Sequence, residues 1–217
     1  MTDWLAGQAE AMDRKVEGRN RNGEPVRAVV MARSYPTNID DLWQAITDPG
    51  RIRRWLLPVS GDLRLGGTYQ LQGNAGGVIE RCAPPRLLSV TWVFGGNTSW
   101  VDVTLEADGE DSTRLVLEHI AREDDAGLAF WEQFGPGAVG VGWDLGLLSL
   151  VNHVGGAEPM AREEELIRSA EGRAFVAASS EAWRKANVAF GTPENAAREA
   201  ALRTTAFYTG KSADTGA

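Results

Sequence analysis

The feature that most constrains this chain is a series of short hairpin segments between residues 61 and 121. Apolar and polar residues alternate along these segments, and short turns, most of them containing glycine, separate one segment from the next. Such turns leave no room for crossover helices, so neighbouring strands must run antiparallel. Together with a strand over residues 26–35, the pattern predicts an antiparallel sheet of about seven strands.

Helical patterns lie on both sides of the strand series. Residues 3–17 are expected to form a helix, and Asn38 is a suitable N-cap for a second helix that Pro49 ends. Pro49 then begins a third, short helix. Residues 137–154 are apolar almost all round, which predicts a long helix buried on both sides. An antiparallel sheet has one apolar face that must be covered, and this helix is the candidate of matching length.

A change of composition follows Gly155 and Gly156. The next residues are rich in Ala, Glu and Arg and predict a hairpin of two helices, with Thr192 as N-cap, Pro193 at the first helical position and Gly210 as the stop. Its apolar faces must dock, either on its own domain or on a second chain in a homodimer. The expected organisation is an N-terminal helix and turn over residues 1–25, a domain over 26–157, a helical hairpin over 158–210 and a disordered tail over 211–217.

The overall charge excludes several classes of partner. The formal net charge is −8 and the isoelectric point about 4.9, so we expect neither nucleic acid nor an anionic membrane surface as a partner.

Cys82 is the single cysteine, which rules out an internal disulfide and fits a cytoplasmic protein. The N-terminus lacks the basic and apolar regions of a signal peptide. The apolar stretch 137–156 carries Asp144, Asn152 and His153, which predicts a buried helix and no membrane span.

Cofactor and metal sites are not expected. Two histidines and one cysteine provide no zinc-binding spacing. Residues 135–140, GPGAVG, match the dinucleotide pattern G-x-G-x-x-G, but that pattern belongs between a strand and a helix of a parallel βαβ unit. Here it follows an antiparallel sheet. No nucleophile-elbow pattern marks a catalytic serine.

His119 is the polar residue with the most potential for chemistry. Strand alternation places it on the inner face of the sheet with Leu115 and Leu117. Two interpretations stay open: a core histidine bonded to a neighbour, or a polar anchor or acid–base group in a pocket. Glu80 and Asp144 are the carboxylates that could act with it, although Glu80 fits either face of its strand.

A helix-to-strand junction also suggests a pocket. Residues 51–57, RIRRWLL, set three arginines, expected to be solvated, beside Trp55, which we place at the rim of an apolar pocket. Gly142 and Gly146 lie one turn apart on the long helix, which predicts the close approach of another element or room for a ligand. His153 is expected to cap the end of that helix.

Several short motifs together resemble one superfamily. They are Arg33-x-Tyr35, Leu42-Trp43-x-Ala45, Thr47-Asp48-Pro49, Ile52-x-x-Trp55, Gly61-Asp62-x-Arg64-x-Gly66-Gly67-x-Tyr69, Gly77-x-Ile79-Glu80, Pro84-Pro85-Arg86-Leu87, Thr91-Trp92 and Thr113-Arg114-Leu115. Over residues 26–155 the chain resembles the helix-grip (START-like, SRPBCC) superfamily and, within it, the Aha-type family, named for homology to an activator of the heat-shock chaperone ATPase. The resemblance implies a curved antiparallel sheet wrapped around a long C-terminal helix. The superfamily includes lipid carriers, cyclases, hormone receptors and co-chaperones, so the resemblance leaves the function open.

The predicted fold class is α+β: a helix-grip domain with a helical C-terminal extension. As the function we predict binding of a small hydrophobic molecule in an apolar cavity between the sheet and the long helix. The residues predicted to form the site are Trp55, Tyr69, Leu71, Glu80, Trp92, His119, Trp143, Asp144 and Leu147. Two alternatives stay open: a cyclase- or hydrolase-like enzyme with His119 as acid or base, and a protein-interaction domain, for which the family name implies a chaperone partner.

Overall fold

The computed structural model describes residues 2–157 and 163–210. In chain order the helices and strands are Thr2–Glu10 (α1), Asp13–Arg21 (β1), Glu24–Tyr35 (β2), Ile39–Thr47 (α2), Pro49–Trp55 (α3), Val59–Gly61 (β3), Thr68–Leu71 (β4), Gly76–Ala83 (β5), Leu87–Phe94 (β6), Asn97–Ala107 (β7), Thr113–Arg122 (β8), Asp125–Phe134 (α4), Gly137–Val154 (α5), Glu163–Arg168 (α6), Ala170–Phe190 (α7) and Glu194–Thr209 (α8). The tail predicted to be disordered, residues 211–217, lies outside the described residues.

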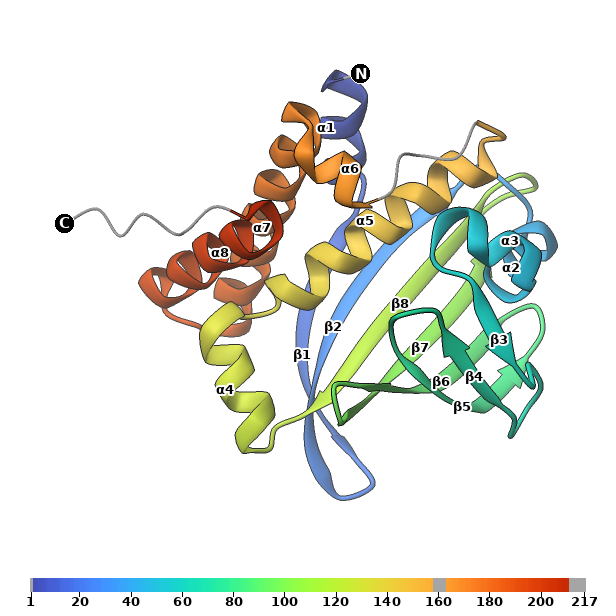
Figure 1. Ribbon diagram of the computed structural model, residues 1–217, viewed down its shortest axis with the longest axis horizontal. Helices are drawn as coiled ribbons and strands as arrows, with labels where there is room; N and C mark the ends of the chain where they lie inside the picture. Colours follow the sequence, from blue (N-terminus) through green and yellow to red (C-terminus); the bar gives the residue numbers. More distant parts are fainter. Residues whose placement is uncertain (1, 158–162, 211–217) are drawn as a thin grey trace. The chain divides into compact units, whose positions relative to one another are not determined.

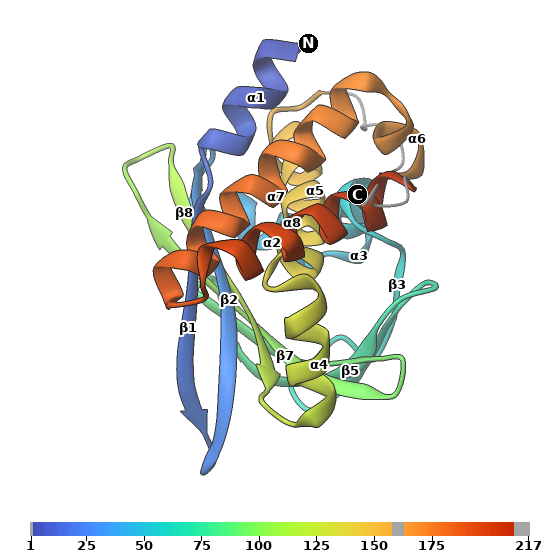
Figure 2. The same cartoon turned by 90° about the vertical axis from the view of Figure 1, so that its left-hand side faces the viewer.

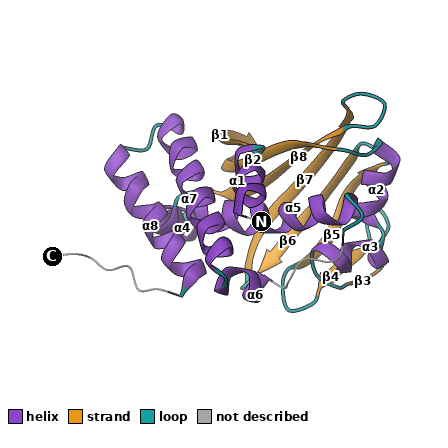
Figure 3. Ribbon diagram, turned by 90° about the horizontal axis from the view of Figure 1, so that it is seen from above, coloured by secondary structure: helices purple, strands orange, loops and turns teal. Residues whose placement is uncertain are grey.

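The strands form one eight-stranded sheet in the order β1-β2-β8-β7-β6-β5-β4-β3 (Figure 1). From β3 to β8 each strand pairs antiparallel with the next along the chain. Figure 3 shows β6, β7 and β8 side by side. The sheet is curved and does not close into a barrel. The predicted antiparallel sheet is therefore confirmed, with one strand more than expected.

The additional strand is β1, which lies in a region predicted to be helical. The helix expected over residues 3–17 ends at Glu10, and the chain continues as a strand from Asp13. Asn22 and Gly23 have positive φ angles of 56° and 92°, the geometry of a tight hairpin turn whose twist matches that of the flanking strands. This turn connects β1 to β2, so the helical prediction beyond Glu10 is wrong.

The register of β6, β7 and β8 fixes which side chains share a face. Val90 pairs with Val101, and Val101 pairs with His119. All three side chains are buried, as are Leu115 and Leu117, which are the neighbours of His119 that alternation along β8 predicts. This face is the apolar side of the sheet.

The described chain divides into two compact units. Of the described residues, the sheet unit comprises 30–121 and 146–157, and the helical unit comprises 2–29, 122–145 and 163–210. The helical unit thus draws on three separate stretches of sequence. The domain organisation predicted from the sequence uses contiguous segments, chiefly 26–157 and 158–210. This organisation stays a prediction, because a division into compact units does not show which segments fold independently.

The two short helices of the sheet unit begin as the sequence predicts. The Asn38 side chain accepts a hydrogen bond from the amide of Asp41 and caps α2. The Asp48 side chain accepts from the amide of Arg51 and caps α3, with Pro49 in the first turn. These caps fix the junction that leads from the helices into β3.

The second half of α5, from Gly146 onward, belongs to the sheet unit. The Tyr35 hydroxyl of β2 donates to the main-chain oxygen of Leu147 at 3.4 Å. Leu147, Leu148 and Leu150 are buried. These features confirm the predicted helix-grip fold, in which the long helix covers the apolar face of the sheet.

In the helical unit, α7 packs against α1 and β1, and α8 packs against α7 and α4 (Figure 2). The predicted hairpin therefore docks on its own chain, while the homodimer stays a prediction. The cap of α8 is Pro193, without a side-chain hydrogen bond, so the helix begins one residue later than the predicted Thr192 cap allows. Gly210, with a φ of 65°, ends α8 in the left-handed conformation, as predicted.

The close helix approach that the sequence predicts occurs at Gly140. A Cβ placed there would lie 2.2 Å from the Trp183 ring of α7, so only glycine fits. At Gly142 a Cβ would meet the end of the Tyr208 side chain at 2.7 Å, and at Gly146 it would lie 3.6 Å from Leu56, an ordinary contact. The predicted close approach is thus present at Gly142, where α8 comes near, and absent at Gly146, and the tightest contact of the helix is at Gly140.

Candidate ligand-binding site

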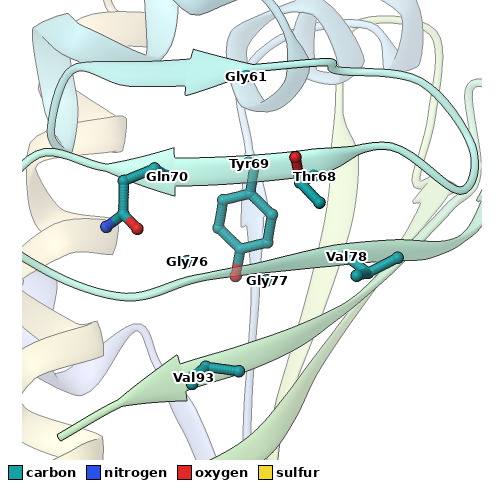
Figure 4. A pocket seen from close by; sticks show the side chains of 8 residues that line it. All are labelled: Gly61, Thr68, Tyr69, Gln70, Gly76, Gly77, Val78 and Val93. Carbon is teal, nitrogen blue, oxygen red and sulfur yellow. The ribbon is translucent and has the colours of Figure 1, made fainter.

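A pocket of about 430 Å³ lies in the sheet unit, where strands β3 to β6 run side by side (Figure 4). We call it the Tyr69 pocket. It is lined by Gly61, Thr68, Tyr69, Gln70, Gly76, Gly77, Val78 and Val93. None of these residues carries a formal charge, and Val78 and Val93 are 38% and 42% exposed although they are aliphatic. The pocket is therefore an accessible and partly apolar surface.

The Tyr69 side chain crosses a whole strand. Tyr69 pairs with Gly77 of β5, and its hydroxyl donates to the main-chain oxygen of Thr91 on β6 at 2.8 Å. The ladder between β5 and β6 is interrupted there, because the paired positions pass from Gly76 directly to Ile79. The phenol thus satisfies a carbonyl group that the neighbouring strand leaves unpaired. Burial raises the pKa of Tyr69, which keeps the phenol neutral.

Glycine is required at two adjacent positions of β5. A Cβ at Gly77 would lie 2.1 Å from the main-chain oxygen of Thr91, and a Cβ at Gly76 would lie 2.5 Å from Oε1 of Gln70. The Thr91 hydroxyl accepts a hydrogen bond from the amide of Val78 at 2.8 Å, which holds the interrupted strands together. The pocket consequently has a floor of main chain with no side chain rising from it.

A second group of predicted residues meets on the apolar face. The rings of Trp92 and His119 lie edge to face with centroids 5.9 Å apart, and His119 Nε2 lies 2.9 Å from the Ser99 hydroxyl. Ser99 donates its one hydroxyl hydrogen to the main-chain oxygen of Trp92 at 3.1 Å. Its oxygen therefore accepts from His119, which places the imidazole hydrogen on Nε2.

The protonation of His119 decides between its two interpretations. Burial lowers the pKa of His119 to about 4, so the ring is neutral over the whole physiological range. An acid–base group working near neutral pH needs a pKa near that pH. The environment therefore gives no support to the acid–base role, and the contact with Ser99 agrees with the first interpretation, a core histidine bonded to a neighbour.

Four other predicted site residues of the sheet unit lie apart from the Tyr69 pocket. Trp55, expected at a rim, is buried, and its indole nitrogen donates to the main-chain oxygen of Ala45 at 2.9 Å. Leu71 and Leu147 are buried as well. Glu80 is exposed and so does not face the apolar side with His119. Of the nine residues predicted, Tyr69 alone lines the pocket.

Trp143 and Asp144 belong to the helical unit, where both are buried. Oδ2 of Asp144 accepts hydrogen bonds from Arg14 Nε at 2.9 Å, the Ser179 hydroxyl at 2.5 Å and the Trp183 indole at 3.0 Å. Burial raises the pKa of Asp144, whereas the Arg14 guanidinium and the hydrogen bonds from Ser179, Arg14 and Trp183 lower it. Asp144 thus joins β1, α5 and α7, which corrects its predicted role as a partner of His119.

The arginine cluster at the start of α3 is only partly solvated. Arg53 and Arg54 are exposed, but Arg51 forms an ion pair with Asp41 at 2.7 Å and donates through Nε to His153 Nε2 at 3.2 Å. Burial and the neighbouring arginines lower the pKa of His153. His153 therefore connects α5 to α3 as an acceptor, which differs from its predicted role as a helix cap.

Helix α4 was not predicted, and none of its residues is buried. Phe130 and Phe134 have ring centroids 5.3 Å apart, and Phe134 and Phe207 of α8 have centroids 5.5 Å apart. Phe130 is 45% and Phe207 64% exposed. We call these three residues the aromatic strip. Its exposure is unusual, because large apolar side chains are generally covered when they cluster.

Sequence reasoning missed most of the Tyr69 pocket. None of Gln70, Gly76, Gly77, Val78 and Val93 is among the nine residues predicted to form the site. The one usable signal was the pair of adjacent glycines entering a strand opposite an aromatic residue, since glycine inside a strand often marks a bulge or a close approach.

The described residues form neither a metal-binding cluster nor a single membrane-spanning helix. Within residues 2–157 and 163–210, no three His, Cys, Asp or Glu side chains are grouped so that they could hold a metal ion. Across the same residues, no single helix is long and apolar enough to cross a membrane. The pair α4 and α5, bent by 73°, meets that test together on length and composition.

The curved sheet with a long helix across its apolar face defines a START-like helix-grip protein. Residues 36–154 match the sequence model of the family described as Activator of Hsp90 ATPase homolog 1-like protein. This match covers more than half of the chain, so the chain belongs to that family, as its motifs predict.

Solved structures agree with this assignment. CalU16 from Micromonospora echinospora is 34% identical in its solution structure, with 84% of this chain and 97% of CalU16 covered and a TM-score of 0.68. Its crystal structure gives 33% identity, coverage of 80% and 98%, and a TM-score of 0.62. DynU16, from the dynemicin biosynthetic locus, is 21% identical, with 61% of this chain and 48% of DynU16 covered and a TM-score of 0.51, which shows the fold alone. No curated protein matches the chain.

Proposed function

We propose that this protein binds a small, largely apolar molecule in the Tyr69 pocket. The observation that carries the proposal is the pocket itself, about 430 Å³ in volume, built over a glycine floor and beside aliphatic side chains. Ligand sites in proteins commonly have volumes of about 300–1,000 Å³ and combine apolar walls with a few polar groups. The START-like fold is compatible with ligand binding.

The pocket adjoins the aromatic residues that the sequence singled out. Thr91, which accepts from Tyr69, directly precedes Trp92 on β6, and Trp92 lies against His119. The neutral Tyr69 phenol and the absence of charged lining residues favour an uncharged molecule over an ion. This arrangement supports binding rather than acid–base catalysis.

A neutral hydrophobic fluorophore such as Nile red tests the proposal. We expect saturable fluorescence enhancement with the unaltered protein and its loss with Val78→Trp, which fills the pocket from an exposed position. Leu65→Trp is the matched control, since Leu65 is 61% exposed and lies outside the pocket lining. Equal binding by the two variants, with both folded, would place the fluorophore elsewhere and count against the pocket. Native mass spectrometry of the purified protein would show whether a ligand is retained.

A second candidate function is protein interaction through the aromatic strip. The specific observation is the exposure of Phe130 and Phe207 on two packed helices. The family description names activation of the Hsp90 ATPase, so an Hsp90-type chaperone is the partner to test, and a second copy of the chain is the other possibility. Light scattering and chaperone ATPase rates should be compared for the unaltered protein and a Phe130→Ser, Phe207→Ser double variant. An unchanged mass and an unchanged ATPase rate with both proteins would remove this candidate.

A further inference from the structure

We infer that the Tyr69 pocket takes an uncharged, flat molecule that donates a hydrogen bond to Oε1 of Gln70. The inference rests on the proposed function, because it specifies the ligand class for the same pocket. Three features of the lining carry it: the absence of charge, the shape of the floor and the orientation of one amide group.

The lining selects against charged ligands. None of its eight residues is acidic or basic, and the one titratable group, the Tyr69 phenol, is already engaged with the main-chain oxygen of Thr91 at 2.8 Å. A charged ligand would lose hydration on entering and would gain no opposite charge in return. An uncharged ligand does not meet this cost.

The floor of the pocket is flat. Gly61, Gly76 and Gly77 all belong to the lining, so main chain is exposed where side chains would otherwise stand. Aliphatic groups of Val78 and Val93 flank this floor (Figure 4). A planar apolar body can lie against such a surface with contact along its whole face.

The Gln70 side chain supplies a directed acceptor. Its Nε2 group donates to the main-chain oxygens of Leu71 and Asn74, both at 2.8 Å. These two acceptors use both amide hydrogens and determine which end of the amide carries nitrogen. Oε1 is thereby turned toward Gly76, where a Cβ would lie only 2.5 Å from it. A hydroxyl or N–H group on a ligand above Gly76 has this oxygen as its acceptor.

Three probes that share a naphthalene ring separate these features. 2-Naphthol is uncharged and donates a hydrogen bond, 2-methoxynaphthalene is uncharged but cannot donate, and 2-naphthoate is charged at neutral pH. Each is titrated into the full-length protein while the amide signals of Gly76, Gly77, Val78 and Val93 are followed by NMR. We expect 2-naphthol to bind about tenfold more tightly than 2-methoxynaphthalene, the ratio that one hydrogen bond supplies. We expect 2-naphthoate to give no saturable shift.

A substitution then assigns the hydrogen bond. Gln70→Met keeps the length of the side chain and removes the acceptor, so 2-naphthol should bind it about tenfold more weakly while 2-methoxynaphthalene binds it as before. Gln72→Met is the control, because Gln72 is exposed and outside the lining. Should Gln70→Met fail to fold, the comparison of probes on the unaltered protein still decides the question.

The outcomes separate the inference from the function on which it rests. Equal affinity of 2-naphthol and 2-methoxynaphthalene at these amides would overturn the hydrogen bond to Gln70 and leave the pocket as a ligand site. Binding of 2-naphthoate as tight as that of 2-naphthol would overturn the selection for uncharged ligands. If no probe shifted these four amides, the proposed function itself would be overturned.

Discussion

The Tyr69 hydroxyl donates to the main-chain oxygen of Thr91 across the intervening strand β5, at a distance of 2.8 Å. In a sheet, a main-chain carbonyl group usually accepts a hydrogen bond from a main-chain amide of the next strand. Here the Tyr69 side chain is the donor, at a position where the pairing of β5 and β6 is interrupted. The break, the glycines and the pocket are therefore one feature. The pocket exists because β5 carries no side chain at Gly76 and Gly77, where it passes close to Gln70 and Thr91.

Replacing the phenol tests this relationship. Tyr69→Phe removes the hydroxyl and leaves the Thr91 carbonyl without that donor, so the free energy of unfolding should fall by about 1–2 kcal/mol. Urea denaturation measures the loss, and amide exchange of Gly77 and Val78 should accelerate. The control is Tyr208→Phe, which removes a hydroxyl bonded to Ala138 in the helical unit and should leave exchange at those two amides unchanged. Unaltered stability and exchange in Tyr69→Phe would show that the hydrogen bond does not hold the strands.

The buried histidine makes stability depend on pH in a defined direction. The pKa of His119 is about 4 in the folded protein, whereas an unfolded histidine has a pKa of about 6.5. The unfolded chain therefore binds the proton first, so the contribution of His119 is fully present above about pH 6.5 and is lost as the pH falls toward 4. The loss is on the order of 3 kcal/mol.

The His119→Asn variant lacks this titration. Its stability, measured by urea denaturation between pH 4 and 7, should fall less steeply than that of the unaltered protein over the same range. His153 is the only other histidine, and His153→Asn should change the slope less, because His153 is only half-buried. Parallel curves for the unaltered protein and His119→Asn would mean that folding does not lower the pKa of His119.

The carboxylate of Asp144 should be essential to the helical unit. Asp144→Asn leaves the buried Arg14 guanidinium without its counter-charge, which typically costs about 3–5 kcal/mol of stability. Glu181→Gln, which removes an exposed ion pair with Arg184 on α7, should have little effect. In a double-mutant cycle of Asp144→Asn with Arg14→Met, the loss of stability in the double variant should be much smaller than the sum of the two single losses. Additive losses would show that the two side chains do not interact.

Two glycines of α5 should respond oppositely to alanine. Gly140→Ala places a methyl group 2.2 Å from the Trp183 ring and should destabilise the protein by about 1–3 kcal/mol, because overpacking forces the helices apart. Gly146→Ala meets its neighbour at 3.6 Å and should stabilise the protein by up to about 1 kcal/mol through better helix propensity. Melting temperatures of the two variants compare them directly, and a tolerated Gly140→Ala would show that α5 and α7 can separate.

The sequence predicts those parts of the fold that depend on local chemistry. Asn38 and Pro49 mark their helices because capping and proline geometry act within a few residues. Strand β1 was missed because Leu5, Met12 and Val16 recur at a spacing that also suits a helix. What makes it a strand is pairing with β2, and pairing is not visible in the segment alone.

The site is less predictable for the same reason. Alternation identifies Tyr69 and His119 as inward-facing residues, but it does not show that the pairing of β5 and β6 breaks between Gly76 and Ile79. Asp144 was recognised as a buried carboxylate, yet its partner Arg14 lies 130 residues away in the sequence. Contacts between residues so far apart in the sequence arise from tertiary packing. They produce no periodic pattern of residues from which they could be predicted.

The two ends of the sheet bear on how the protein behaves at high concentration. Strand β3 has three residues, and six of the nine residues of β1 are charged, namely Asp13, Arg14, Lys15, Glu17, Arg19 and Arg21. An open sheet grows into fibrils when another chain adds a strand to a long, apolar edge. One end here is too short for that addition, and the other carries charged side chains in place of a long apolar run. Both ends of the sheet therefore lack the long, apolar edge on which strand addition depends.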